Sequence, residues 1–350
     1  MDKFKIGICG LGRMGRYHLS IYEKLVEEKE LPVEIVAVCD IDEAKLYGGA
    51  TAKVNLSNEL NNVISDRYHK YTNIDEMLQN EKLDMVDIVV PTYLHAEYSV
   101  KVLNKGINCF CEKPMALNTV QCDEMIYAAR KNQKHLMIGH CLRFWKEYAY
   151  LKDSVDDLRY GKVLGAYFYR GGYADHVNNP SWENWIITRE KGGGALFDQH
   201  IHDTDAINWI FGTPNHLSVH GRKFFKNSAH DIVSASYGYS DKVITALDDI
   251  SYRGLPFEYG YTVNFEKACL RYQNNKLTIY HEDCSVEEPD LSSYGTDDAY
   301  YNEIRYFINC ILDNKTIDVC PPIDSKDTIR LSLLEMHSAD NFGKTILSGE

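Results

Sequence analysis

The chain has 350 residues, 44% of them apolar, and a formal net charge of −13 at pH 7. This length favours two domains, and the negative charge, which no basic run offsets, argues against nucleic acid or an anionic membrane as a partner because a polyanion would be repelled. No apolar run approaches the roughly 18 residues of a membrane span, and the start does not resemble a signal peptide, so we expect a cytoplasmic protein.

Short apolar runs alternate with helical stretches along residues 1–115. Strands are predicted at 5–10, 34–40, 85–91 and 108–114, with a helix at 16–29. Such alternation predicts parallel strands joined by helical crossovers, which is a doubly wound α/β sheet. The polar stretch 46–71 is interpreted as helix plus loop. Asn118 can cap a helix that ends near Lys131, and 135–140 is predicted as one more strand.

Beyond about Arg143 the strand pattern changes. Runs rich in β-forming residues, several of them alternating, lie at 163–173, 216–225, 231–240, 243–253 and 259–281, and QNNK at 273–276 is predicted as a hairpin turn. Helices are predicted at 296–315 and 325–346. The runs predict a C-terminal α+β domain with a large, mostly antiparallel open sheet. This change alone places the domain boundary, with one domain over 1–122 and the other over 123–350. An open sheet needs its exposed face covered, which favours a homodimer or homotetramer.

A glycine motif directly follows the first predicted strand. Gly10, Gly12 and Gly15 have the G-x-G-x-x-G spacing, in which the first glycine permits a tight turn, the second lets the backbone approach a pyrophosphate, and the third lets helix and strand pack closely. Arg13 and Met14 lie inside this motif and are also expected to contact the cofactor, and the N-terminal amides of the helix that follows would face the phosphates. The same spacing also occurs in simple strand–helix turns, so its context decides.

That context is Asp40, which ends the next predicted strand. A carboxylate there accepts hydrogen bonds from the adenosine ribose and repels a 2′-phosphate. The sequence therefore predicts a Rossmann domain that binds NAD, with NADP less favoured. A helix cap is the alternative role for Asp40, Asp42 is the alternative acidic residue, and Lys45 could still admit NADP.

The segment FDQHIHDTDAINW contains three aspartates and two histidines. If it is helical, Asp198 and His202 lie one turn apart on one face, and His200 points away. Oxidation of a secondary alcohol needs a base for the hydroxyl proton, and the histidine pKa near neutrality suits that role. A metal site formed by His200, His202, Asp203 and Asp205 is less favoured, because no other segment supplies obvious ligands, so no metal is expected. A structural histidine and a helix-capping aspartate stay open.

The glycine motif, VAVCD, VDIVVPTYLHAEY, CEKP and GGGALFDQHIHDTD occur in this order along the chain. In this they resemble the Gfo/Idh/MocA family, over essentially the whole sequence. That family comprises NAD(P)-dependent oxidoreductases that act mostly on sugars and cyclitols, such as inositol dehydrogenase and glucose–fructose oxidoreductase. The resemblance implies a Rossmann domain and a C-terminal domain with a large open sheet that commonly builds dimers or tetramers.

The resemblance also implies roles for single residues. Lys113 of E-K-P matches the family's active-site lysine, whose ammonium would stabilise a developing alkoxide and keep a nearby imidazole neutral. We expect His202 as general acid/base, Asp198 as its orienting partner or a substrate hydroxyl acceptor, and Lys113 as their electrostatic partner, with Lys113 as the base an alternative. The remaining implied cofactor contacts are Pro91, Thr92, His95 and Glu112. Lys113–Pro114 is expected to be a cis peptide, and Val90 departs from the small polar residue of many relatives.

Substrate contacts are predicted in the loop GGYADHVNNPSWENW. Trp182 and Trp185 offer a flat apolar platform to a polyhydroxylated ring, with Asp175 and His176 as hydrogen-bonding neighbours; a packed aromatic loop is the alternative. The resemblance adds Arg143 to the substrate contacts, along with the three catalytic residues.

The predicted activity is a dehydrogenase that transfers a hydride between a CH–OH group of a sugar, glycoside or cyclitol and nicotinamide C4. A non-catalytic NAD(P)-binding sensor and a reductase of a non-carbohydrate ring are the alternatives. The presence of Lys113, Asp198 and His202 argues against the sensor, which has no physical need for them.

Overall fold

The computed structural model describes residues 3–47, 50–52, 60–62, 64–172, 185–251, 254 and 256–349. The chain forms two compact units, the first from residues 1–139 with 303–323 and the second from 140–302 with 324–350. Residues 123–139 belong to the first unit because β8 (Leu136–Gly139) pairs with β7 (Asn108–Glu112). The predicted domain division at residue 122 stays a prediction.

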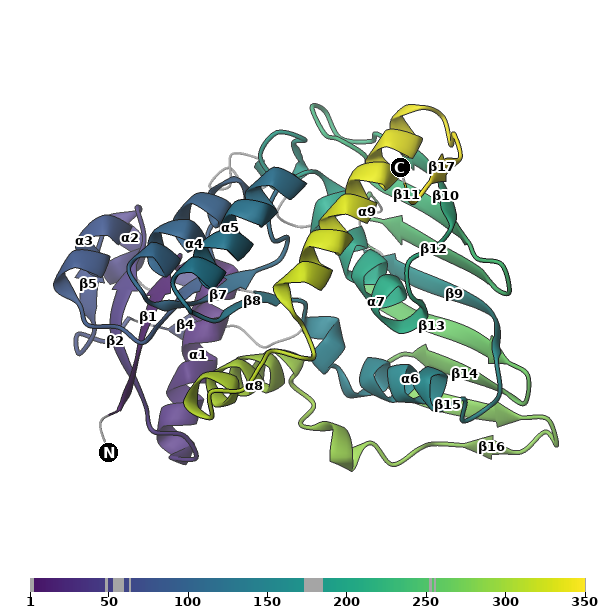
Figure 1. The fold of residues 1–350 in the computed structure, drawn as a ribbon, viewed down its shortest axis with the longest axis horizontal. Coiled ribbons are helices and arrows are strands. Elements are labelled where there is room, and N and C mark those ends of the chain that lie inside the picture. The colour runs from purple at the N-terminus through teal and green to yellow at the C-terminus, as the bar shows by residue number, and fades with distance from the viewer. Residues whose placement is uncertain are drawn as a thin grey trace. The chain divides into compact units, whose positions relative to one another are not determined.

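The first unit contains a six-stranded parallel sheet in the order β5-β2-β1-β6-β7-β8 (Figure 1). Its other elements are β1 (Phe4–Cys9), α1 (Arg13–Glu28), β2 (Val33–Cys39), α2 (Glu43–Tyr47), β5 (His69–Tyr71), α3 (Ile74–Asn80), β6 (Met85–Ile88), α4 (His95–Asn104) and α5 (Thr119–Lys131), joined by part of α8 (Ala299–Leu312). Helices α4 and α5 cover one face of the sheet, and α1 and α8 the other. The predicted doubly wound sheet is confirmed.

Most predicted elements of the first unit are present, with one exception. The helix predicted to end near Lys131 is α5, and Asn118 is its N-cap as predicted. The Asn118 side chain accepts a hydrogen bond from the Gln121 amide. The interpretation of 46–71 as helix plus loop is wrong in part, because it contains β3 (Ala50–Ala52), β4 (Leu60–Asn62) and β5. Residues 48–49, 53–59 and 63 lie outside the described ones. Strand β5 is polar, and it lies at the edge of the sheet, where its backbone pairs with β2. Because its sequence has no apolar pattern, the strand could not be predicted from periodicity.

The second unit contains a nine-stranded mixed sheet in the order β16-β15-β14-β13-β9-β12-β11-β10-β17. Its elements are α6 (Lys146–Asp156), β9 (Val163–Gly171), a π-helix (Leu196–His200), α7 (Ile201–Phe211), β10 (His216–Arg222), β11 (Ile232–Gly238), β12 (Val243–Asp249), β13 (Glu258–Phe265), β14 (Ala268–Gln273), β15 (Lys276–His281), β16 (Val286–Glu287), α9 (Pro322–Asp340) and β17 (Ile346–Leu347). Among the described strand pairs of this sheet, β9 and β12 alone are parallel, so the predicted mostly antiparallel sheet is confirmed. The predicted turn between β14 and β15 is a two-residue hairpin, with Asn274 and Asn275 at positive φ.

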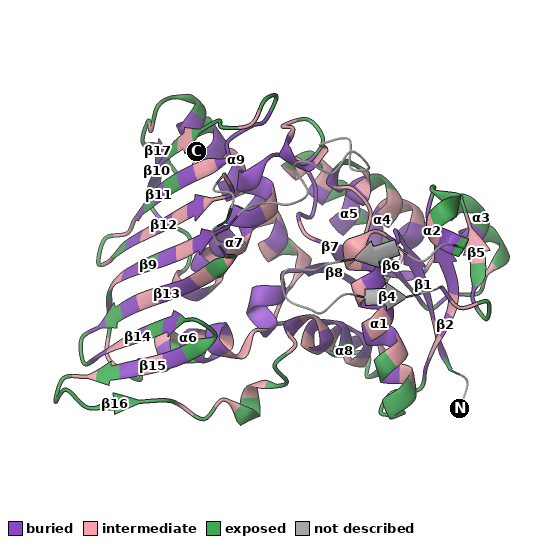
Figure 2. Cartoon of the chain, turned by 180° about the vertical axis from the view of Figure 1, so that it is seen from behind, coloured by how far each residue is buried: buried purple, intermediate pink, exposed green. Residues whose placement is uncertain are grey.

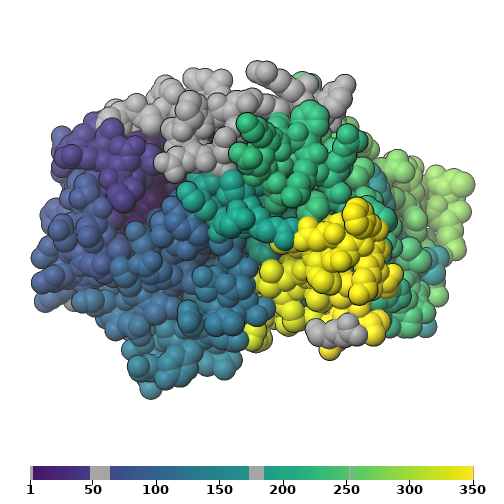
Figure 3. All heavy atoms as spheres, turned by 90° about the horizontal axis from the view of Figure 1, so that it is seen from above, coloured from purple at the N-terminus to yellow at the C-terminus, as the bar shows by residue number. Residues whose placement is uncertain are grey.

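Helices α6, α7 and α9 cover one face of the nine-stranded sheet, and among the described residues no helix or strand covers the other, the open face. Burial therefore alternates along the central strands, as Figure 2 shows. Tyr167 and Tyr169 of β9 and Val243 and Leu247 of β12 point to the open face and are exposed or half-buried. The C-terminal residues, yellow in Figure 3, form part of the surface of the same unit. No helix within the described residues combines the length and apolar character needed to cross a membrane.

Candidate functional site

The glycine motif forms the turn between β1 and α1, and each glycine has a distinct environment. Gly10 has a φ of +101°, and a Cβ there would lie 2.1 Å from the Val89 carbonyl oxygen. A Cβ on Gly15 would lie 1.8 Å from the Gly10 carbonyl oxygen, so helix and turn are in direct backbone contact. A Cβ on Gly12 would meet nothing within 4 Å. The open space at Gly12, at the N-terminus of α1, is where a pyrophosphate can approach the backbone amides.

Asp40 follows β2 and holds this turn. Its carboxylate accepts hydrogen bonds from the Leu11 amide at 2.7 Å and the Asp42 amide at 2.9 Å. The Lys45 ammonium lies 3.4 Å from both carboxylate oxygens. Asp42 is exposed and accepts from the Ala44 amide, so the helix-capping role falls to Asp42 rather than to Asp40. Asp40 is therefore fixed beside the glycine turn, as an acceptor for ribose hydroxyls needs to be.

The carboxyl ends of β6 and β7 supply the other predicted cofactor residues. Pro91 and Thr92 follow β6 and begin a short 3₁₀-helix, and Lys113 follows β7. His95 connects the two loops, since its ring nitrogens lie 2.6 Å from the Pro114 carbonyl oxygen and 2.8 Å from that of Val90. The expected cis peptide at Lys113–Pro114 is confirmed. Both loops follow the carboxyl ends of parallel strands, which is where doubly wound sheets bind their ligands.

The segment FDQHIHDTDAINW of the second unit, residues 197–209, is less regular than predicted. Leu196–His200 form a π-helix, and the α-helix begins only at Ile201. The expected α-helical spacing of Asp198 and His202 is thus altered by a π-turn, a feature frequent at functional sites. Gly193 and Gly194, both at positive φ, precede the segment and allow its tight entry. Cys141 Sγ lies 4.0 Å from His202 Nδ1.

Only two of the five acidic and histidine side chains in the segment are accessible. Asp198 and His202 are half-buried. By contrast, His200, Asp203 and Asp205 are at most 1% exposed. This difference separates side chains that a ligand can reach from those that serve the interior.

Two buried arginine–aspartate pairs anchor α7. Arg170 of β9 donates to Asp203 at 3.1 and 3.2 Å, and Arg143 donates to Asp205 at 2.8 and 2.9 Å. Burial raises the pKa of Asp203 despite Arg170. Burial also opposes ionisation of Asp205, but the Arg143 and His140 charges and the hydrogen bonds to it lower its pKa overall. The second pair is therefore the one that favours the charged carboxylate.

His200 is part of a separate buried network. Its Nε2 lies 3.1 Å from the Tyr237 hydroxyl, which donates to Glu335 of α9 at 2.8 Å. Burial, and then the Arg170 charge, lower the pKa of His200 to about 3. His200, the last residue of the π-helix, is therefore a neutral side chain that is linked through Tyr237 of β11 to α9. His200, Asp203 and Asp205, three of the four candidate ligands of the metal alternative, thus have other partners, and the absence of a metal stays a prediction.

The predicted substrate contacts fall into three groups. Asp175, His176 and Trp182 lie outside the described residues. Trp185 packs against the apolar cluster of Ile186, Ile187, Ala195 and Ile250. Arg143 is 2% exposed and also donates to Asp324 at 2.9 Å. The substrate roles of all of these residues stay predictions, and the observed contacts of Trp185 and Arg143 are structural.

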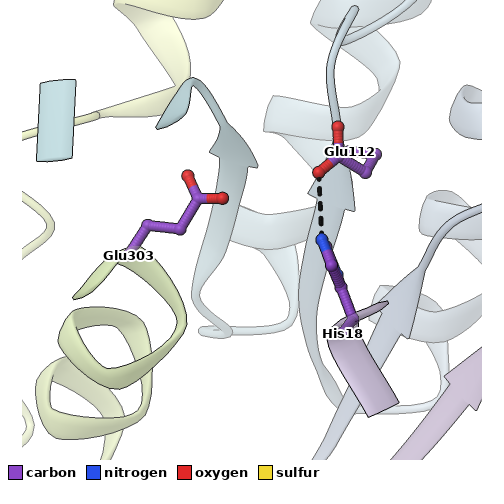
Figure 4. Close-up of side chains that lie close together, drawn as sticks. All are labelled: His18, Glu112 and Glu303. Atoms are coloured by element: carbon purple, nitrogen blue, oxygen red, sulfur yellow. Dashed lines mark ion pairs between the residues drawn. The ribbon is translucent and has the colours of Figure 1, made fainter. Parts of the chain in front are cut away.

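Sequence reasoning missed a buried polar cluster in the first unit. His18 of α1 lies between Asp87 of β6 and Glu112 of β7. Figure 4 shows His18 and Glu112 with Glu303 of α8 beside them. One signal was available, because Asp87 interrupts the apolar run MVDIVV. A carboxylate in a buried strand requires a partner.

Two family models match the chain. The oxidoreductase family model with the NAD-binding Rossmann fold, of the Gfo/Idh/MocA type, matches residues 4–140, and the GFO/IDH/MocA C-terminal domain model matches 148–279. The first model covers the whole six-stranded sheet, and the second covers most of the nine-stranded sheet.

Curated relatives match over part of their length. The chain is 34% identical to 2,7-anhydro-N-acetylneuraminate hydratase of Mediterraneibacter gnavus over 61% of this chain and 55% of that protein. It is 28% identical to inositol 2-dehydrogenase of Salmonella typhimurium over 59% of this chain and 54% of that protein. The chain thus spans about half the length of these relatives.

The solved structure of levoglucosan dehydrogenase, in complex with NADH and levoglucosan, has a similar fold. The TM-score is 0.83 with 14% identity, and the match covers 99% of this chain and 100% of the other. At this identity the likeness concerns the fold.

Proposed function

The chain belongs to the Gfo/Idh/MocA family of NAD-binding oxidoreductases, and from this premise we propose that it transfers a hydride between a secondary alcohol of a sugar, glycoside or cyclitol and NAD. The observation that carries the proposal is the partial exposure of Asp198 and His202, whereas His200, Asp203 and Asp205 of the same segment are at most 1% exposed. A carboxylate and an imidazole that a substrate can reach are suited to proton transfer to or from a hydroxyl group.

Three side chains are assigned to the reaction. His202 removes the hydroxyl proton of the alcohol, and Asp198 orients His202 or accepts a second substrate hydroxyl. The Lys113 ammonium stabilises the negative charge that develops on the substrate oxygen. NAD, when bound, supplies the hydride acceptor. In the opposite direction, His202 returns the proton to the alkoxide oxygen.

The first unit offers a suitable binding site for NAD. The open space at Gly12 and the amides of α1 fit a pyrophosphate, and the buried Asp40 carboxylate fits a ribose diol. Asp40 also disfavours the additional phosphate of NADP. Because Lys45 lies 3.4 Å from Asp40 and partly compensates its charge, the preference for NAD is moderate rather than absolute.

Hydration of an anhydro sugar is a second candidate reaction, favoured by the 34% identity to the hydratase. Addition of water leaves the overall oxidation state of the substrate unchanged, so reduced nicotinamide would not accumulate as the substrate is consumed. Asp198 and His202 would then serve as the proton-transfer pair for the water.

The open face of the nine-stranded sheet supports a homo-oligomer as part of the proposal. Tyr167, Tyr169, Val243 and Leu247 form an apolar patch in the middle of that face. Such a patch on a sheet is typical of an interface with another chain. A second copy of this chain covers it by an isologous contact in a homodimer.

The test is an absorbance assay of NADH formation with NAD and a panel of pyranoses, glycosides, anhydro sugars, uronates and inositols. Substrate consumption is followed in parallel by chromatography. We expect NADH to form with one substrate class, and we expect a Lys113→Ala, His202→Ala protein to lose the activity by at least about a thousandfold.

The matched control replaces an exposed lysine and an exposed histidine, Lys105→Ala with His220→Ala, and should keep full activity. Consumption of an anhydro sugar without NADH would select the hydratase. NADH binding without consumption of any compound would favour the sensor and contradict the proposed reaction.

A further inference from the structure

The buried cluster behind Lys113 consists of one imidazole and three carboxylates. His18 Nδ1 lies 2.8 Å from Asp87 Oδ2, and His18 Nε2 lies 3.2 Å from Glu112 Oε1. One ring nitrogen of His18, one carboxylate oxygen of Glu112 and one of Glu303 all lie within 4.8 Å of one another. In Figure 4 the Glu303 carboxylate points from α8 toward the other two residues. His18, Asp87 and Glu303 are 0% exposed, and Glu112 is 6% exposed.

This arrangement requires positive charge at His18. Buried carboxylates are costly unless paired, and three of them face a single imidazole. Burial alone would lower the pKa of His18, but the charges and hydrogen bonds of Asp87 and Glu112 outweigh it and raise the pKa well above its ordinary value. His18 is therefore an imidazolium at neutral pH, whose Nδ1 is hydrogen-bonded to Asp87 and whose Nε2 lies at ion-pair distance from Glu112.

The cluster is connected directly to Lys113. Glu112 Oε1 faces His18, while Glu112 Oε2 accepts a hydrogen bond from the Lys113 amide at 3.0 Å. Both oxygens are thus fixed, and the carboxylate cannot rotate without losing one contact. A Cβ on Gly139 would lie only 3.2 Å from Oε1, so the neighbouring strand leaves the carboxylate little free space. The position of His18 thereby sets the orientation of the Lys113 backbone.

We infer that His18 is a positioning residue for Lys113, which it holds through the anionic Glu112 carboxylate. Asp87 fixes the ring from its other side, and Asp87 also accepts a hydrogen bond from the Tyr22 hydroxyl at 3.0 Å. The functional consequence rests on the proposed role of Lys113 in catalysis. The structural part, a charged His18 that orders the Lys113 amide, does not depend on that role.

The first test is hydrogen exchange at the Lys113 amide of the intact protein, measured by NMR or by mass spectrometry of a short proteolytic peptide that contains Pro114. We expect His18→Gln to accelerate that exchange at least about tenfold relative to the amides of Cys109 and Cys111 in the same strand. The reason is that the Glu112 carboxylate, which accepts the hydrogen bond of the Lys113 amide, is no longer held by His18. The matched control is His69→Gln, which removes an exposed histidine paired with Glu81 at 2.6 Å and should leave the Lys113 amide unchanged. Equal exchange in His18→Gln and wild type would overturn the inference.

The second test uses the wild-type protein and does not depend on the folding of His18→Gln, which leaves the buried Asp87 and Glu112 carboxylates without their ion-pair partner. Nitrogen-15 NMR of labelled histidines should show His18 with both ring nitrogens protonated at about pH 8. A neutral imidazole, or stoichiometric Zn²⁺ binding that His18→Gln abolishes, would overturn the inference in favour of a cation site.

Kinetics then tests the link to catalysis. His18→Gln should lower kcat about tenfold or more and leave the KM for NAD within about twofold, since no cofactor contact is removed. An unchanged kcat with an altered Lys113 amide would overturn the functional link. If no substrate is turned over by the wild type, the proposed function fails, while the exchange and NMR results still decide the role of His18.

Discussion

Replacement of Arg143 by methionine is the sharpest test of how α7 is held in place. The guanidinium is buried and donates two hydrogen bonds to Asp205, which is 1% exposed. Methionine has a similar length but leaves the Asp205 carboxylate with only Thr328 at 2.8 Å and His140 at 3.6 Å. Breaking a buried ion pair by removing one partner costs about 3–5 kcal/mol. The contact of Arg143 with the half-exposed Asp324 adds about 1 kcal/mol at most.

The pH dependence has a definite sign. In the wild type the folded pKa of Asp205 is depressed, so its contribution to stability is present above the unfolded value of about 3.9 and is lost as pH falls through the folded pKa. In Arg143→Met, burial is the main remaining effect and raises the pKa of Asp205. The variant then takes up a proton on folding and gains stability as pH falls. The cost of the substitution should therefore shrink between about pH 7 and pH 4.

Urea unfolding followed by tryptophan fluorescence measures this cost. All four tryptophans lie between residues 140 and 302, so the signal reports on the second unit. The control is Lys276→Met, which removes an exposed pair with Glu288 and should cost about 1 kcal/mol or less. A loss of less than about 1 kcal/mol for Arg143→Met at pH 7, or a cost that grows as pH falls, would refute the reasoning.

Three further predictions concern the cofactor turn and the open sheet. Gly15→Ala should destabilise the first unit by about 1–3 kcal/mol in denaturant unfolding, because its Cβ would meet the Gly10 carbonyl. Gly12→Ala should keep the stability, because its Cβ meets nothing within 4 Å, but should weaken NADH binding in a fluorescence titration. Asp40→Ser should raise the ratio of NADP to NAD affinity about tenfold or more in the same titration, and an unchanged ratio would contradict the assigned role. Tyr167→Glu should shift the protein from oligomer to monomer in light scattering at micromolar concentration, and an unchanged mass would place the interface elsewhere.

Much of the first unit could be predicted because its signals are local. Parallel strands buried on both faces give continuous apolar runs, and the glycine spacing reports backbone geometry that only glycine permits. The cap at Asn118 and the hairpin at Asn274 and Asn275 are equally local. The polar edge strand β5 escaped prediction because its pairing with β2 is a long-range backbone contact.

The candidate site was only partly accessible to such reasoning. Spacing singled out Asp198 and His202, but the same spacing could not tell which neighbours face a ligand. The neighbouring acidic and histidine side chains each bind a partner that is distant in the sequence. Asp203 pairs with Arg170, Asp205 pairs with Arg143, and His200 contacts the Tyr237 hydroxyl.

By itself, then, the sequence determined the two kinds of sheet, the nucleotide-binding turn and the family, because periodicity, glycine positions and short motifs act over a few residues. Only the tertiary structure decided which charged side chains are buried, because a buried charge must be paired and its partner is found through space. The tertiary structure shows that Arg143 is paired with Asp205 and that Asp198 lies in a π-helix. It also shows that His18 contacts Glu112, the residue before Lys113.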